Sequence, residues 1–296
     1  MRFRRRQGLR LEGLIEAGLA LAAFLAVAVT LGIAGTLLWE ALPFFREIGV
    51  APLFGTEWAP LFAAPRYGLL PLLSGTLVIT AIALLVSVPV GTILAIYLSE
   101  YAPSRAREIL KPALELLSAV PTVVYGYFAL LFVTPLLRRF LPDLGAFNML
   151  SAGLVMGLMI VPYVSSLAED AMRSVPMALR EASYAMGATR LETSVRVVVP
   201  AAFSGLVSAY VLAVSRAVGE TMVVAIAAGM QPNLSLDPRD PAQTVTSYIV
   251  QVTLGDLPHG SIGYQTIFVA GLSLFFVTLA FNIGGHFLRR RYREAY

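Results

Sequence analysis

Long runs without a charged residue constrain this chain more than any other feature. A helix needs roughly 20 apolar residues to cross a bilayer, and four uncharged runs reach that length: Ala17–Leu38, Leu69–Leu98, Leu116–Leu137 and Leu144–Ala168. A fifth run, 203–228, qualifies apart from two charges, and a sixth, 257–288, is apolar from about Ile262. Because the bilayer core has no water to satisfy open backbone groups, each run should be helical. We therefore expect an all-α integral membrane protein with six transmembrane helices.

The composition supports this class and excludes several others. Hydrophobic residues make up 57% of the chain and charged residues 14%, against about 45–50% and about 25% in soluble domains. The chain has no cysteine, so disulfides, thiol catalysis and cysteine-based zinc sites are excluded. It also lacks the basic patch interleaved with aromatic residues that nucleic-acid binding requires.

Positive charges predict the orientation, because they accumulate on the cytoplasmic face. Sixteen would lie on one face if both termini were cytoplasmic: Arg2, Arg4, Arg5, Arg6, Arg10, Arg105, Arg107, Lys111, Arg173, Arg180, Arg190, Arg196, Arg289, Arg290, Arg291 and Arg293. Five would lie on the opposite face: Arg46, Arg66, Arg138, Arg139 and Arg239. We therefore predict cytoplasmic termini. We expect the segments 40–67 and 231–256 to be extracytoplasmic loops with short helices at most.

The residues that an enzyme would need are missing. The two histidines, His259 and His286, fall near opposite ends of the last run, so they are not expected to share a metal ion. A Walker A motif places lysine after glycine, but the only lysine, Lys111, follows Leu110. The chain is thus predicted to be neither an enzyme nor a cofactor or metal-binding protein, and any ATP must be bound by another subunit.

The cytoplasmic segment 175–200 has the pattern of two short helices joined by a turn. Pro176 suits a helix start, and Gly187 suits a helix end because glycine readily adopts positive φ. Thr189 and Glu192 have the spacing of a capping box that begins a second helix. These residues alone leave two interpretations open: a docking element for a partner, or an amphipathic connector without one.

This segment resembles the EAA loop of ABC importer permeases. The residues that carry the resemblance are Glu181, Ala182, Ser183, Gly187, Val197, Val199 and Pro200, with Ser183, Val197 and Val199 as conservative departures from the family pattern. The resemblance implies that the segment docks into a separate ATPase subunit and couples ATP hydrolysis to transport.

Further stretches resemble the permeases of phosphate-specific ABC importers, and the PstC-type subunit more than the PstA-type. They are "SGTLVIT" (74–80), "IYLSEYAP" (96–103), "LLSAVPTVVYG" (116–126), "MIVPYVSS" (159–166) and "SRAVGETM" (215–222). The resemblance implies the type I, MetI-like permease fold and import of inorganic phosphate across the inner membrane. It also implies a PstA-type partner permease, an ATPase subunit dimer and an extracytoplasmic phosphate-binding protein.

Three alternatives remain at this point. A permease for another oxyanion, such as sulfate or molybdate, would share the docking segment. An integral membrane enzyme would need a cluster of histidines or carboxylates at one depth. An ion-coupled carrier usually has internal repeats, which are not evident here.

Two charges, Arg216 and Glu220, interrupt the fifth run. Each costs about 2.5–3.5 kcal/mol at the bilayer centre, whereas a pair four residues apart on one helix face returns only about 0.2–0.5 kcal/mol. Helix stability therefore does not explain them. One interpretation is a structural ion pair to a neighbouring helix. The other is that Arg216 offers its forked donors to phosphate oxygens, while Glu220 holds Arg216 or accepts a hydrogen bond from a protonated phosphate.

The resemblance assigns this arginine and glutamate to the translocation path. Ser118, Thr122 and Tyr125, expected on the third transmembrane helix, are further candidates for lining the same cavity.

These expectations divide the chain into four parts. Residues 1–16 form a basic cytoplasmic N-terminus, and 17–68 the first transmembrane helix with an extracytoplasmic loop. Residues 69–288 form the permease core, with five transmembrane helices and the coupling loop 175–200, and 289–296 a basic cytoplasmic C-terminus.

Overall fold

The computed structural model describes residues 2–255, 257, 258 and 260–291, and side chains from residue 12 onward. His259 and Arg293, used in the sequence-based arguments, lie outside the described residues. The described α-helices are α1 (Arg2–Glu47), α2 (Leu70–Ile96), α3 (Ser104–Ala119), α4 (Thr122–Phe128), α5 (Thr134–Arg138), α6 (Met149–Arg173), α7 (Met177–Ala185), α8 (Arg190–Thr193), α9 (Val199–Ala201), α10 (Phe203–Val218), α11 (Met222–Ala227), α12 (Val245–Thr253) and α13 (Ile262–Arg291).

Short irregular elements join these helices. A 3₁₀ turn follows α1 (η1, Ala51–Phe54), and π turns interrupt or extend helices at η2 (Tyr97–Tyr101), η3 (Ala129–Val133) and η4 (Ser194–Val198). The strands β1 (Trp58–Ala59) and β2 (Arg66–Tyr67) form an antiparallel pair. This hairpin lies in the predicted outer loop.

The all-helical membrane class is confirmed. Four helical stretches of the described chain are long and apolar enough to span a bilayer: Glu12–Glu47, Leu70–Tyr101, Met149–Arg173 and Ile262–Arg291. Two bent pairs bring the number to six if each pair is one span: Ser104–Ala119 with Thr122–Arg138, and Arg190–Ala201 with Phe203–Val218.

The prediction of one helix over Leu116–Leu137 is wrong in detail. The chain turns by 88° between α3 and the segment that begins with α4. Val120 is extended, with ψ of 129°, because the ring of Pro121 disfavours helical geometry in the residue before it. Ser118 therefore lies at the end of α3, whereas Thr122 and Tyr125 lie on α4.

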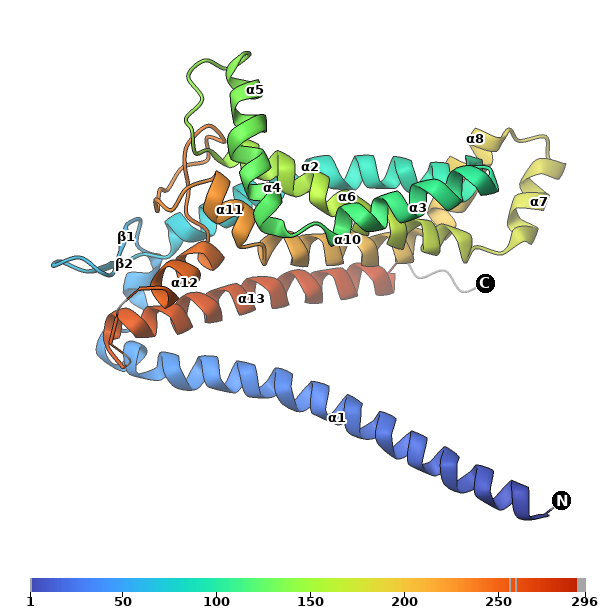
Figure 1. The fold of residues 1–296 in the computed structure, drawn as a ribbon, viewed down its shortest axis with the longest axis horizontal. Coiled ribbons are helices and arrows are strands. Elements are labelled where there is room, and N and C mark those ends of the chain that lie inside the picture. The colour runs from blue at the N-terminus through green and yellow to red at the C-terminus, as the bar shows by residue number, and fades with distance from the viewer. Residues whose placement is uncertain (1, 256, 259, 292–296) are drawn as a thin grey trace.

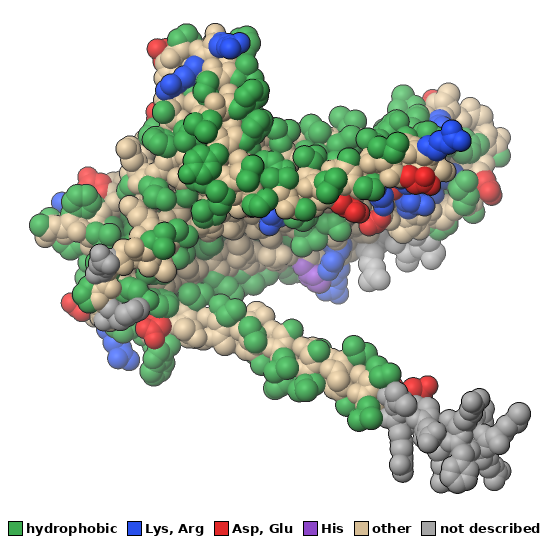
Figure 2. Space-filling model, in the orientation of Figure 1, with side chains coloured by type: hydrophobic (Ala, Val, Ile, Leu, Met, Phe, Trp, Pro, Cys, Tyr) green, Lys and Arg blue, Asp and Glu red, His purple; other side chains and the backbone are tan. Residues whose placement is uncertain are grey.

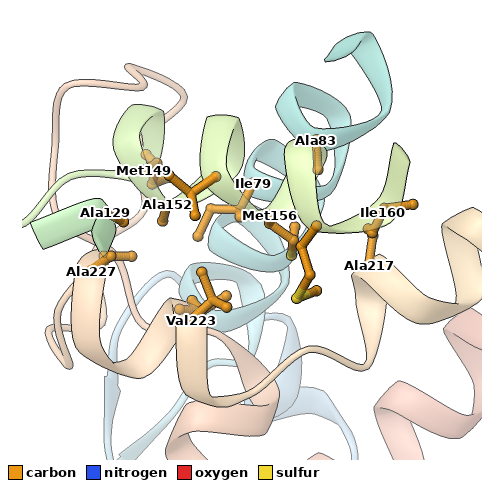
Figure 3. Packing of buried hydrophobic residues seen from close by; sticks show 14 of the residues in the cluster. Ile79, Ala83, Ala129, Met149, Ala152, Met156, Ile160, Ala217, Val223 and Ala227 are labelled. Carbon is orange, nitrogen blue, oxygen red and sulfur yellow. The ribbon is translucent and has the colours of Figure 1, made fainter. Parts of the chain in front are cut away.

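The main core is formed by α2 and α6 with α10 and α11 (Figure 3). Small residues let α2 and α6 approach closely: a Cβ at Gly153 would lie 2.7 Å from Ile82, and one at Gly157 2.8 Å from Val86. Such close contacts replace the hydrophobic effect as the force that holds helices together in lipid. Helices α10 and α11 both pack against α6, and α10 also packs against α2.

Helix α1 extends away from the rest of the chain (Figure 1). Only its end packs inside the molecule, where Ala41 and Phe44 join a second core with Tyr248 of α12 and Val269 of α13. Phe24 and Leu31, farther along α1, are each 67% exposed. The apolar face of α1 is thus available to lipid or to a neighbouring chain.

Both outer segments contain more structure than a plain loop. Helix α1 continues to Glu47, beyond the end of the uncharged run at Leu38. In the segment 231–256, α12 begins with a capping box formed by Thr244 and Ser247, and its Tyr248 is buried. Short helices were allowed for by the sequence-based prediction, but the burial of α12 was not foreseen.

Candidate functional site

The charged stretch of the fifth run lies at a break between two helices, α10 and α11. Helix α10 ends at Val218, Gly219 follows it, and α11 begins at Met222. The prediction of one continuous helix over 203–228 is therefore wrong at this point. Arg216 lies in the last turn of α10, while Glu220 lies between the helices, so the two do not share one helix face.

Glu220 caps the second helix. Its Oε1 accepts hydrogen bonds from the backbone N–H groups of Met222 (3.2 Å) and Val223 (3.4 Å). Its backbone carbonyl accepts a hydrogen bond from Thr246 Oγ1 of the α12 segment at 2.6 Å. Glu220 is only 6% exposed. Its carboxylate therefore satisfies open donors at the start of α11, as charged caps do at helix N-termini.

Arg216 is left without an acidic partner from the described part of its own chain. No ion pair joins it to Glu220 there, so the prediction that Glu220 holds Arg216 is not supported. Its Nε is buried and has no hydrogen-bond partner among the described residues. Its guanidinium lies over the ring of Tyr163 on α6, 4.8 Å from the centroid. This cation–π contact stabilises the charge but leaves forked donors unused.

Tyr163 contacts Arg216 and also lines a cavity that contains Ser118 but not Thr122, Tyr125 or Arg216 from the predicted set. The cavity, of about 260 Å³, lies between α3 and α6, and its lining includes Ser118, Lys111, Tyr163 and Glu169. Ser118 and Tyr163 thus line one cavity, and Tyr163 also lies under the guanidinium of Arg216. The stretch "MIVPYVSS" contains Tyr163, but an aromatic residue in an apolar run does not reveal that its ring lies under an arginine.

Thr122 and Tyr125 are placed by the packing of α4 on α11. Gly126 allows this approach, because a Cβ there would lie 3.0 Å from Ile226. The Tyr125 hydroxyl donates to the backbone carbonyl of Leu117 at 2.7 Å, across the bend that follows α3. Tyr125 therefore ties α4 to the end of α3, and α4 packs Thr122 and Tyr125 beside α11, which follows the helix break.

A second charged site lies at the wall of this cavity. Glu169 of α6 is fully buried and is surrounded by cations: Lys111 Nζ at 3.0 Å, Arg173 Nη1 at 3.5 Å and Arg107 Nε at 3.6 Å. Lys111 and Arg107 belong to α3, so these ion pairs hold α3 against α6. A buried carboxylate requires such compensation.

The predicted turn of the segment 175–200 is confirmed. Helix α7 ends at Ala185, Gly187 has φ of +85°, and α8 begins with a capping box of Thr189 and Glu192. Ser183 and Thr193 share a hydrogen bond of 2.8 Å between their hydroxyl oxygens, which ties α7 to α8. Charged side chains gather over the end of the molecule where α7 and α8 lie (Figure 2).

The surface of this segment is open toward solvent. Glu181, Ala182, Gly187 and Pro200 are exposed, and Met186 is 88% exposed. Ser183, Val197 and Val199 are half-buried and hold the helices together. A partner could therefore contact these exposed residues without unfolding the segment.

The sequence of residues 87–294 matches the family of binding-protein-dependent transport system inner membrane components. A probable ABC transporter permease, YqgH of Bacillus subtilis, is 35% identical over 92% of this chain and 86% of that protein. The phosphate transport system permease PstC of Xylella fastidiosa is 31% identical over 88% of this chain and 85% of that protein.

Two solved structures show the same fold at lower identity. The MetNI methionine ABC transporter, in an inward-facing conformation, superposes with a TM-score of 0.56 at 20% identity, over 77% of this chain and 95% of that chain. A bacterial ABC transporter that imports alginate gives a TM-score of 0.58 at 18% identity, over 92% of this chain and 96% of that chain. The chain therefore belongs to the family of binding-protein-dependent transport system inner membrane components, as a multi-pass permease subunit of an ABC importer in which ATP is bound by a separate ATPase subunit.

Proposed function

We propose that this permease imports inorganic phosphate as a PstC-type subunit. The single observation that carries the proposal is the state of Arg216. Its Nε is a buried donor at a helix break, and the described chain supplies no acidic partner for it. The substrate is suggested by the 31% identity of the chain to a PstC. A dianionic oxyanion fits the forked guanidinium, which pairs well with planar or tetrahedral oxygen groups.

The proposed route passes the break between α10 and α11. Phosphate would accept hydrogen bonds from Arg216 and displace the guanidinium from the ring of Tyr163. Glu220 would fix the position of the break through its hydrogen bonds with Met222, Val223 and Thr246, and would accept a hydrogen bond from the hydroxyl group of monohydrogen phosphate. Sulfate carries no such hydroxyl group at neutral pH. Ser118, Thr122 and Tyr125 would line the route on the side of α3 and α4.

The proposed assembly has four kinds of subunit. This chain would pair with a PstA-type permease, and the exposed face of α7 and α8 would dock on an ATPase dimer. An extracytoplasmic phosphate-binding protein would deliver the anion to the opposite face. The MetNI and alginate systems support the general arrangement, since each is an ABC transporter whose permease has this fold.

The orientation belongs to the same proposal. The coupling loop and both termini would be cytoplasmic, in keeping with the excess of positive residues on that face. Cysteines introduced into this cysteine-free chain at Met186 and at Leu236, which is 79% exposed, should be labelled from opposite sides. Labelling of both from one side would contradict the orientation.

The alternative substrate is another oxyanion, such as sulfate or molybdate. The name of YqgH specifies no substrate, whereas the PstC relatives are named for phosphate. The test is ATP hydrolysis by the reconstituted complex in the presence of binding protein loaded with phosphate or with sulfate. Stimulation by the phosphate-loaded protein alone supports the proposal, and stimulation by the sulfate-loaded protein alone overturns it.

A further inference from the structure

One arginine of the coupling loop faces inward. Arg180 is the only buried residue of α7, with 8% of its surface exposed, although the helix otherwise lies at the surface. A buried charge is costly unless it is paired and hydrogen-bonded. The partners of Arg180 therefore indicate what holds α7 in place.

Those partners belong to two long helices. Arg180 Nε donates to Glu100 Oε2 at 3.2 Å, and Nη2 donates to Glu100 Oε1 at 2.8 Å. Glu100 lies in η2, which continues α2. Arg180 also donates from Nη2 to the carbonyl of Met172 (2.9 Å) in α6, and from Nη1 to that of Val175 (2.7 Å) just beyond it. One side chain thus joins α7 to the ends of both α2 and α6.

The surrounding contacts make this region a single unit. Ser99 donates to Glu100 Oε1 at 2.8 Å and helps to orient the carboxylate. The guanidinium of Arg190, in α8, lies 5.1 Å from the ring centroid of Tyr101. Both helices of the coupling loop therefore contact η2, at neighbouring residues.

We propose that the Arg180–Glu100 ion pair transmits movement of the coupling loop to α2 and α6. The inference rests on the proposed coupling role of the segment 175–200. Neither residue is among those proposed to bind phosphate, so both would act by positioning. A bidentate arginine–carboxylate pair fixes direction as well as distance, whereas an apolar contact would allow α7 to slide along the membrane helices.

The test uses the complete complex in liposomes, with ATP hydrolysis and phosphate uptake measured separately. The variants are Arg180→Gln, Glu100→Gln, Arg180→Lys and the charge exchange Glu100→Arg with Arg180→Glu. Arg105→Gln, an exposed arginine of α3, is the matched control. We expect Arg180→Gln and Glu100→Gln to lower phosphate uptake per ATP hydrolysed roughly 2- to 30-fold, the size of effect that residues linking two sites produce.

The charge exchange separates coupling from stability. It should restore part of the uptake per ATP, because the ion pair can re-form while the hydrogen bonds to the carbonyls of Met172 and Val175 are lost. Wild-type uptake per ATP in all assembled single variants would overturn the proposal, whatever their thermal stability. An exchange variant that assembles but stays as uncoupled as the single variants would also overturn it.

Arg180→Lys covers the case in which the glutamine variants do not assemble. Lysine keeps the charge but loses the fork, so lowered uptake per ATP supports the proposal and a wild-type ratio overturns it. A wrong assignment of phosphate as the substrate would appear separately. In that case phosphate-loaded binding protein would not stimulate ATP hydrolysis by the wild-type complex. The uptake per ATP hydrolysed would then be measured with the anion whose loaded binding protein does stimulate ATP hydrolysis.

Discussion

Arg180 is buried and Arg216 is half-buried with a buried Nε, and the surroundings of the two arginines differ. Arg180 meets a carboxylate and two backbone carbonyls of its own chain. Arg216 meets only an aromatic face, and its buried Nε has no partner among the described residues. An arginine whose donors are used holds the fold together, whereas an arginine whose donors are free can bind a ligand. The comparison therefore separates a structural link from a substrate-binding candidate.

The strongest test of this difference between Arg180 and Arg216 is to remove each guanidinium and compare the loss in free energy of unfolding. Arg180→Leu should destabilise the protein by about 3–5 kcal/mol, because it leaves Glu100 buried without its partner. Arg216→Leu should cost only about 0.5–2 kcal/mol, the value of a cation–π contact. The measurement is denaturant unfolding of the purified permease in detergent. Equal destabilisation by the two substitutions would remove the distinction.

The second test concerns transport. Arg216→Gln should reduce phosphate uptake by the equivalent of about 1.5–3 kcal/mol, which is the strength of hydrogen bonds to a charged group. Assembly with the ATPase should be unchanged, because no described carboxylate depends on Arg216. Uptake into liposomes checks this, with Arg105→Gln as the control. Normal uptake, or failure to assemble, would indicate that Arg216 has a structural role and does not bind the substrate.

The third test addresses the turn of the coupling loop. Gly187→Val should cost about 1–3 kcal/mol, because a β-branched residue resists φ of +85°. The space around Gly187 is open, so the effect comes from the backbone and not from a clash. Gly187→Asn, which tolerates positive φ better, is the matched control. ATP-driven uptake should fall with valine and persist largely with asparagine; equal uptake in both would show that the turn is not a tight coupling element.

The smallest effect on stability is expected at Glu220. Glu220→Gln keeps an oxygen that can accept from the N–H groups of Met222 and Val223, so only about 0.3–1 kcal/mol of charge–dipole energy is lost. Uptake should nevertheless fall, because an amide N–H donor replaces the second carboxylate oxygen, which is proposed to accept the hydrogen bond from monohydrogen phosphate. Unfolding and uptake measured on one preparation separate the two effects. Unchanged uptake would limit Glu220 to its role as a helix cap.

Local signals in the sequence predicted much of the fold. The uncharged runs predicted the membrane helices, and the glycine and the Thr189–Glu192 spacing predicted the turn between α7 and α8. These features depend on residues within a few positions of each other, so the chain alone determines them. Pro121 also carried the signal for the bend after α3, although the apolar run across it suggested one helix.

The break at Gly219 was missed for a similar reason. Membrane helices tolerate glycine, and the apolar residues on both sides continue the hydrophobic pattern. Whether a helix ends there depends on what else can satisfy its open backbone groups. Here the Glu220 carboxylate and Thr246 of the α12 segment do so, and only the packed structure brings Thr246 to that position.

The sequence by itself determined which segments are helical, where the coupling loop turns, and that charges interrupt an apolar span. Only the tertiary structure decided which charges meet. Arg216 and Glu220, four residues apart, do not pair, whereas Arg180 and Glu100 pair across 80 residues of sequence. The physical reason is range: helix propensity and capping act over one or two turns, but ion pairing requires two atoms within about 4 Å. The packing of α2, α6 and α7 alone sets that distance.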